Sequence, residues 1–84
     1  MSSNWVDKIP GAFGCEDKKF AGHPCDIDRA VKLIEAANEQ GVGFNEYCQT
    51  IHDWLNRNCG QLGSAFIDEQ MEKVRSLESY FRLS

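Results

Sequence analysis

Long apolar stretches are missing from this chain of 84 residues. No run approaches the roughly 18 residues of a membrane-spanning helix, so we expect no membrane segment. No charged segment followed by an apolar one opens the sequence, and without such a signal peptide a cytoplasmic location is predicted. Nine Lys and Arg residues stand against thirteen Asp and Glu, a net charge of −4. This balance lacks the basic surface of a nucleic-acid-binding protein, so direct nucleic-acid binding is not expected.

Length and composition indicate one small globular domain over residues 1–84. Hydrophobic residues make up 42% of the chain and charged residues 26%, which is ordinary globular usage. A core of this size rarely supplies more than about 3–5 kcal/mol of stability, and many such chains gain the remainder from disulfides, a metal ion or self-association. The four cysteines and the C-terminal helix are therefore the features to follow.

Residues 1–25 have no sustained hydrophobic period and are predicted to form an irregular arm. Both prolines fall in this segment. One helical turn that places Trp5 and Ile9 on the same face is compatible with the sequence, and Pro10 is expected to end it. Three aromatic residues are expected to hold the arm against the core: Trp5, Phe13 and Phe20.

Three later segments repeat apolar residues at spacings of three and four, the period of amphipathic helices. The helices are expected at about 26–40, 44–59 and 64–83, with Asp26 and Ser64 as N-caps of the first and third. No segment alternates for long enough to predict a strand. Because short turns favour antiparallel neighbours, the predicted fold is all-α: a compact three-helix bundle with an irregular N-terminal arm.

The four cysteines are first interpreted as free, buried thiols, because no signal peptide points to an oxidising compartment. If disulfides form, Cys48 and Cys59 cannot pair with each other. They are 11 residues apart on one predicted helix, a distance of about 16 Å, whereas a disulfide needs Cα atoms within about 7 Å. A bridge between Cys15 and Cys25, or from either of them to the second predicted helix, stays open.

The cysteine spacing is similar in one respect to the twin Cys-x9-Cys proteins of the mitochondrial intermembrane space. Cys15 and Cys25 enclose nine residues, and Cys48 and Cys59 enclose ten. Membership of that family would imply two disulfides that tie a helical hairpin together, with each cysteine pair on one helix. Pro24 opposes a helix that continues into Cys25, and a complete predicted helix separates the two pairs. We therefore do not assign the chain to this family.

A metal site is the next interpretation of the Cys and His residues. Cys48 and His52 are four residues apart on one predicted helix, and His23 and Cys25 flank a proline, so together they offer the nitrogen and sulfur ligands that zinc prefers. The candidate ligands are His23, Cys25, Cys48, His52 and Cys59. No Cys-x2-Cys knuckle accompanies them, and the default expectation is that the protein has no cofactor. Cys48 with His52 also resembles a nucleophile and its base, but no third catalytic group is evident, so we expect no enzyme activity.

Apolar and acidic surfaces favour a binding role. The third predicted helix carries aromatic residues beyond its main stripe, which indicates contact with another protein or with a second copy of the chain. Aromatic and Arg side chains are frequent anchors of interfaces, and the candidate contact residues are Trp54, Tyr80, Phe81 and Arg82. Two acidic groups are also expected on the surface: Glu35, Glu39, Glu46 and Asp53, and Asp68, Glu69 and Glu72.

The sequence as a whole predicts a small, stand-alone, non-catalytic protein–protein interaction or regulatory module. One alternative is a small metal-binding or thiol redox module that uses the Cys and His residues. The other is an acidic inhibitor of a nucleic-acid-handling enzyme, which would present the acidic residues to a basic groove.

Overall fold

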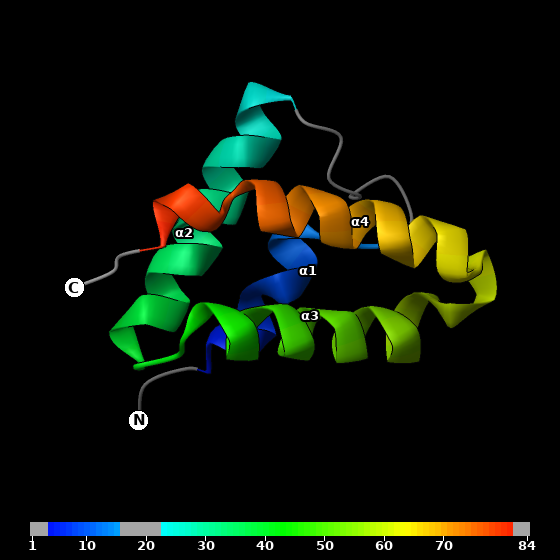
Figure 1. The fold of residues 1–84 in the computed structure, drawn as a ribbon, viewed down its shortest axis with the longest axis horizontal. Coiled ribbons are helices and arrows are strands. Elements are labelled where there is room, and N and C mark those ends of the chain that lie inside the picture. Colours follow the sequence, from blue (N-terminus) through cyan, green and yellow to red (C-terminus); the bar gives the residue numbers. More distant parts are fainter. Residues whose placement is uncertain (1–3, 16–22, 82–84) are drawn as a thin grey trace.

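A computed structural model describes residues 4–15 and 23–81, and the regular structure of these residues is entirely helical (Figure 1). The elements, in chain order, are η1 (Trp5–Lys8), α1 (Ile9–Ala12), α2 (Pro24–Glu39), α3 (Phe44–Cys59), η2 (Gly60–Leu62), α4 (Ser64–Ser76) and η3 (Glu78–Tyr80), where η denotes a 3-10 helix. The all-α prediction is confirmed for the described residues. The expected count of three helices is wrong by one, because part of the predicted arm forms α1.

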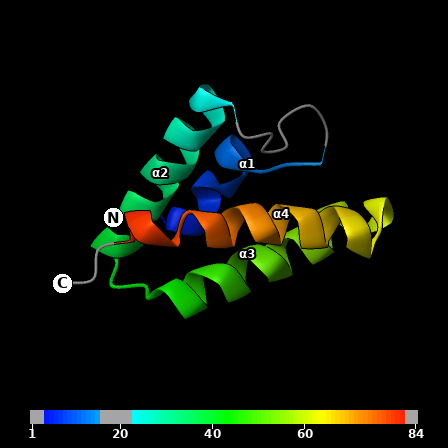
Figure 2. The same cartoon turned by 45° about the horizontal axis from the view of Figure 1, so that its top comes forward.

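The helices meet at two different angles rather than in one parallel bundle. α3 and α4 run side by side in opposite directions, and α2 crosses them steeply (Figures 1 and 2). Gly63 has a φ of +92°, a left-handed conformation that favours glycine, and it lets the chain reverse between α3 and α4. The elements share one core, made of Trp5, Ile9, Ala12, Phe13, Ala30, Leu33, Ile34, Ala37, Tyr47, Ile51, Leu55, Cys59, Ile67, Met71, Val74, Leu77 and Phe81.

The segment predicted as an irregular arm forms one wall of this core. Trp5 is only 4% exposed and stacks on Tyr47 of α3, with ring centroids 5.2 Å apart. Phe13 is fully buried, so two of the three expected anchors are confirmed, and Phe20 lies outside the described residues. Pro10 does not end the first helical turn. It occupies the second position of α1, where a missing N–H breaks no helical hydrogen bond.

A disulfide between Cys15 and Cys59 joins the predicted arm to the last residue of α3, with the two Cα atoms 5.2 Å apart. The interpretation of all four cysteines as free, buried thiols is therefore wrong for this pair. It is one of the bridges from the arm to the second predicted helix that the spacing left open. Cys25 and Cys48 are free, and Cys25 is exposed rather than buried.

α2 begins two residues before its predicted start. Pro24 fits the first helical turn, and the Nδ1 atom of His23 accepts a hydrogen bond of 3.3 Å from the Cys25 amide. His23 rather than Asp26 is thus the N-cap. Asp26 lies in the first turn, where its negative charge complements the helix dipole.

α4 ends at Ser76, well before the predicted residue 83. The chain then tightens into η3, and this turn directs Phe81 back onto α3. Its ring packs edge-on against Tyr47 at 4.9 Å and Phe44 at 5.4 Å between centroids. The helix therefore ends early, and the residues predicted as its last turns instead bring Phe81 into the core. The predicted cap is also shifted, because Gly63 is the N-cap and Ser64 is the first helical residue.

Tyr47 carries a polar atom into the core without a hydrogen-bond partner among the described residues. The side chain is fully buried between Trp5 and Phe81. Burial raises the pKa of its phenol well above the ordinary value of 10.0, and Cys48 adds to the shift. The unfolded chain therefore releases this proton at a lower pH than the folded one.

Tyr47→Phe is expected to leave the free energy of unfolding at pH 7 unchanged or to raise it by up to about 1 kcal/mol, because it removes an unsatisfied hydroxyl and keeps the ring. In the parent protein, the contribution of Tyr47 to stability is fully present below about pH 10 and is lost as the pH rises above that value. The variant should show a shallower alkaline decline. Urea unfolding at pH 7 and across pH 9–12 measures both effects, and a clear loss of stability at pH 7 would contradict this account.

Candidate functional site

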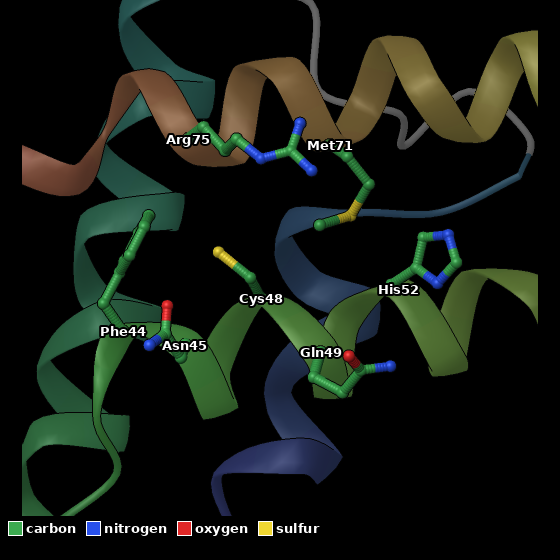
Figure 3. A pocket seen from close by; sticks show the side chains of 7 residues that line it. All are labelled: Phe44, Asn45, Cys48, Gln49, His52, Met71 and Arg75. Carbon is green, nitrogen blue, oxygen red and sulfur yellow. The ribbon is translucent and has the colours of Figure 1, made fainter.

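A groove with a volume of about 520 Å³ lies between α3 and α4 (Figure 3). We call it the α3–α4 groove. It is lined by seven residues: Phe44, Asn45, Cys48, Gln49, His52, Met71 and Arg75. Its volume falls in the range of about 300–1,000 Å³ that is typical of ligand sites.

Helical spacing places these side chains together. Phe44, Cys48 and His52 follow one another at intervals of four residues, so they line one face of α3. Met71 and Arg75 have the same spacing on α4 and face them across the groove. Met71 is buried, and Phe44 packs against the core. The groove therefore has an apolar floor with polar side chains around it.

Cys48 is half-buried, and its sulfur points toward α4 (Figure 3). Burial raises the pKa of the Cys48 thiol, Arg75 opposes the shift and Glu78 adds to it. An activated nucleophile requires a shift in the opposite direction. The His52 ring lies further along α3, and its Nδ1 atom is 3.2 Å from the side-chain nitrogen of Asn56. The geometry thus gives no support to a Cys48–His52 nucleophile and base.

At pH 7, iodoacetamide is expected to modify Cys25 several-fold faster than Cys48. Cys25 is exposed, whereas Cys48 is half-buried and held as a neutral thiol, and only the thiolate reacts. Peptide mass spectrometry over a time course measures both rates in one sample. Cys25→Ser serves as the control, since it leaves Cys48 as the one free thiol. Rapid modification of Cys48 near neutral pH would indicate an activated thiol.

Arg75 supplies the positive charge of the groove. Its side chain is exposed, and it forms no ion pair with a carboxylate of the described residues. Gln49, by contrast, donates a hydrogen bond of 3.4 Å to Asp53 on the outer side of α3. The guanidinium is therefore free to bind a carboxylate from outside, next to the apolar side chains of Phe44 and Met71.

The predicted metal ligands do not assemble into one site. The prediction of Cys59 as a metal ligand is wrong, because its sulfur is bonded to Cys15 and cannot be a thiolate ligand. His23 caps α2 through Nδ1, beside the exposed Cys25. Cys48 and His52 share the α3–α4 groove. Nowhere in residues 4–15 and 23–81 do three or more His, Cys, Asp or Glu side chains form a group suited to a metal ion.

The predicted contact residues have different environments. Tyr80 is 48% exposed, as a contact residue requires. Trp54 is half-buried, packs against the core and lines a separate pocket with Arg57. The prediction of Phe81 as a contact residue is wrong, because its side chain is only 4% exposed and is part of the core. Arg82 lies outside the described residues.

Sequence reasoning missed Arg75, and it did not single out Phe44 or Met71 as site residues. A spacing of four residues between Met71 and Arg75 was the available signal, since it places a cation one turn from an apolar side chain. This spacing is common in helices, and it indicates a binding site only once α3 is known to lie opposite this face of α4.

Comparisons with protein-family models, with curated proteins and with solved structures gave no match. Within the part of the chain that the structure describes, none of the helices has the length and apolar character to span a membrane.

Proposed function

We propose that this protein is a small, non-catalytic protein–protein interaction module and that the α3–α4 groove is its contact surface. One observation carries the proposal: the groove combines an apolar floor with an arginine that has no ion-pair partner among the described residues. The raised pKa of Cys48 supports a binding role over a nucleophilic one, because it keeps the thiol neutral.

The chemistry of the groove indicates what kind of segment it would hold. Phe44 and Met71 favour a bulky apolar side chain, and methionine adapts its shape to such a partner. Arg75 favours a neighbouring carboxylate, with which it can form two parallel hydrogen bonds. The proposed ligand is therefore a segment of another protein in which an acidic residue lies next to a large apolar one. Tyr80, exposed in the turn after α4, extends the surface available to it.

Quantitative affinity capture from an extract of the native organism tests the proposal. Arg75→Glu reverses the charge in the groove and should reduce recovery of a specific partner at least about tenfold, the effect of placing like charges together. Arg57→Glu makes the same change on α3 outside the groove and should leave recovery unchanged. Equal recovery with the two variants would overturn the assignment of the groove.

A second copy of the chain is the other partner to test. Light scattering across a hundredfold range of concentration reports self-association directly. If the chain dimerises and Arg75→Glu abolishes the dimer while Arg57→Glu does not, the partner in the groove is a second copy. If neither variant affects dimerisation, the dimer interface lies elsewhere and the groove proposal fails for self-association.

A thiol redox function is the second candidate, and the Cys15–Cys59 disulfide is the observation that favours it. Cys15 is half-buried, so a reductant or an exchanging thiol has partial access to one of the two sulfurs. The disulfide is also an argument against the predicted cytoplasmic location, because the reducing cytosol keeps most cysteines as free thiols. Alkylation of free thiols before cell lysis, followed by mass spectrometry, determines the state of this pair in the native organism.

The acidic-inhibitor alternative stays a prediction. All seven side chains proposed for it are exposed, as an inhibitory surface requires: Glu35, Glu39, Glu46, Asp53, Asp68, Glu69 and Glu72. Exposure is equally the ordinary state of acidic residues on any protein surface. Glu69 already pairs with Lys73 at 3.8 Å, which reduces its local negative charge.

A further inference from the structure

α1 packs against α2, away from the α3–α4 pair (Figure 2). A second, smaller pocket is lined by residues of this part of the molecule. We call it the α1–α2 pocket, and its volume is about 180 Å³. It is lined by six residues: Lys8, Gly11, Ala12, Arg29, Lys32 and Leu33. Arg29, Lys32 and Leu33 share one face of α2, because they are three and four residues apart.

The apolar residues that line this pocket, Ala12 and Leu33, also belong to the core. Ala12 is 4% exposed and Leu33 is 2% exposed, so both are fixed by packing on their inner sides. Gly11 contributes open space, since a Cβ atom added there would meet nothing within 4 Å. The fold therefore does not require glycine at this position, and a larger side chain there has room beside the pocket without disturbing the core.

The rim of the pocket is positively charged on a protein whose net charge is −4. Three of the nine Lys and Arg residues of the chain line it. Lys8 forms no ion pair with a carboxylate of residues 4–15 and 23–81. Arg29 pairs with Asp26 at 3.7 Å and Lys32 pairs with Asp28 at 3.6 Å.

These two ion pairs are weak competitors for an external anion. The side chains of Arg29 and Lys32 are 58% and 74% exposed, and pairs in such water-accessible positions contribute little. Neither aspartate lines the pocket. An anion that enters it would therefore meet three cationic side chains with no carboxylate among the lining residues.

We propose that the α1–α2 pocket binds a small amphiphilic anion, a carboxylate that carries a short alkyl chain. The carboxylate would lie among Lys8, Arg29 and Lys32, and the chain would lie over Ala12 and Leu33 in the space left by Gly11. The volume limits the size of the ligand. It equals about six water molecules at roughly 30 Å³ each, so a chain of about five or six carbons fits and a drug-sized molecule does not.

Hexanoate is the probe, and two-dimensional ¹H–¹⁵N NMR is the readout. We expect saturable shifts of backbone amides in residues 8–12 and 29–33. Acetate has the charge without the chain, and hexan-1-ol has the chain without the charge. Each should bind at least about tenfold more weakly than hexanoate, because each lacks one of the two contributions.

Variants separate the charge from the cavity. Lys8→Gln should weaken hexanoate binding roughly fivefold, the upper range for one exposed ion pair. Gly11→Leu should abolish binding, because the new side chain fills the pocket, and circular dichroism checks that this variant stays folded. Gly11→Ala adds a single carbon atom and is the fallback if the leucine variant unfolds, with weakened binding expected. Arg57→Gln removes a positive charge outside the pocket and should leave binding unchanged.

Three outcomes would overturn the proposal. The first is the absence of saturable shifts with hexanoate. The second is equal binding of hexan-1-ol or of acetate, which would show that the pocket does not use chain and charge together. The third is a set of shifts confined to the α3–α4 groove. The first two outcomes do not bear on the interaction proposed for the α3–α4 groove. The third would agree with that interaction, because hexanoate combines a carboxylate with an apolar chain, and it would still overturn the proposal for the α1–α2 pocket.

Discussion

Loss of the Cys15–Cys59 disulfide is expected to lower the free energy of unfolding by about 4 kcal/mol, the loop-closure entropy for its sequence separation of 44. A core of this size rarely supplies more than about 3–5 kcal/mol by itself. The disulfide is therefore expected to supply about as much stability as the core, and the reduced protein should unfold at a much lower urea concentration than the oxidised one. Urea unfolding followed by circular dichroism, with and without a phosphine reductant, measures the difference.

The matched control keeps the disulfide and removes the other two thiols. Cys25→Ser combined with Cys48→Ser should leave the stability of the oxidised protein within about 1 kcal/mol of the parent, because Cys25 is exposed and Cys48 is half-buried. Cys59→Ala in the same background should reproduce the effect of the reductant. If the reduced protein unfolded at the same urea concentration as the oxidised one, the core alone would account for its stability.

Replacement of Trp5 by alanine is expected to destabilise the protein by about 3–5 kcal/mol, the usual range for truncating a buried aromatic side chain. Trp5 is 4% exposed, and its ring covers the ring of Tyr47. The substitution removes the stacking contact of the N-terminal segment with Tyr47 of α3. It also leaves a cavity beside Tyr47, which adds to the cost of losing the ring. Thermal and urea unfolding, each followed by circular dichroism, measure the loss.

Trp54→Ala provides a control with the same change of side chain. Trp54 is half-buried at the edge of the core, so its truncation should cost less than half as much. Equal effects of the two substitutions would contradict the central position of Trp5. An unfolded Trp5→Ala chain would agree with the prediction, whereas a loss below about 1 kcal/mol would show that the N-terminal segment contributes little to the core.

Local sequence signals predicted most of the helical structure. α3 has the predicted bounds, because glycines flank a segment with a regular apolar period. α1 was missed because its four residues are too few to show a period. The end of α4 was missed for a different reason. Contacts between Phe81 and the aromatic residues of α3 determine where that helix stops, and these contacts depend on the tertiary arrangement.

The candidate sites were less predictable than the helices. Cys48 and His52 were identified from their spacing, and both line the α3–α4 groove. The role of Arg75 depends on the helix opposite, and one exposed arginine has no distinctive sequence pattern. The pairing of Cys15 with Cys59 likewise depends on where the N-terminal segment lies against α3. Helix geometry alone excludes the Cys48–Cys59 pair, but it does not select one of the remaining pairings.

The position of the disulfide also determines how the chain responds to proteolysis. Residues 15 and 59 are joined covalently, so all of α2 and α3 lie within a closed ring, while α4 lies outside it. A single peptide-bond cleavage inside the ring leaves two fragments that still migrate as one species until a reductant is added. A cleavage within α4 releases a fragment at once. Electrophoresis with and without reductant would therefore assign each protease cut to the inside or the outside of the ring.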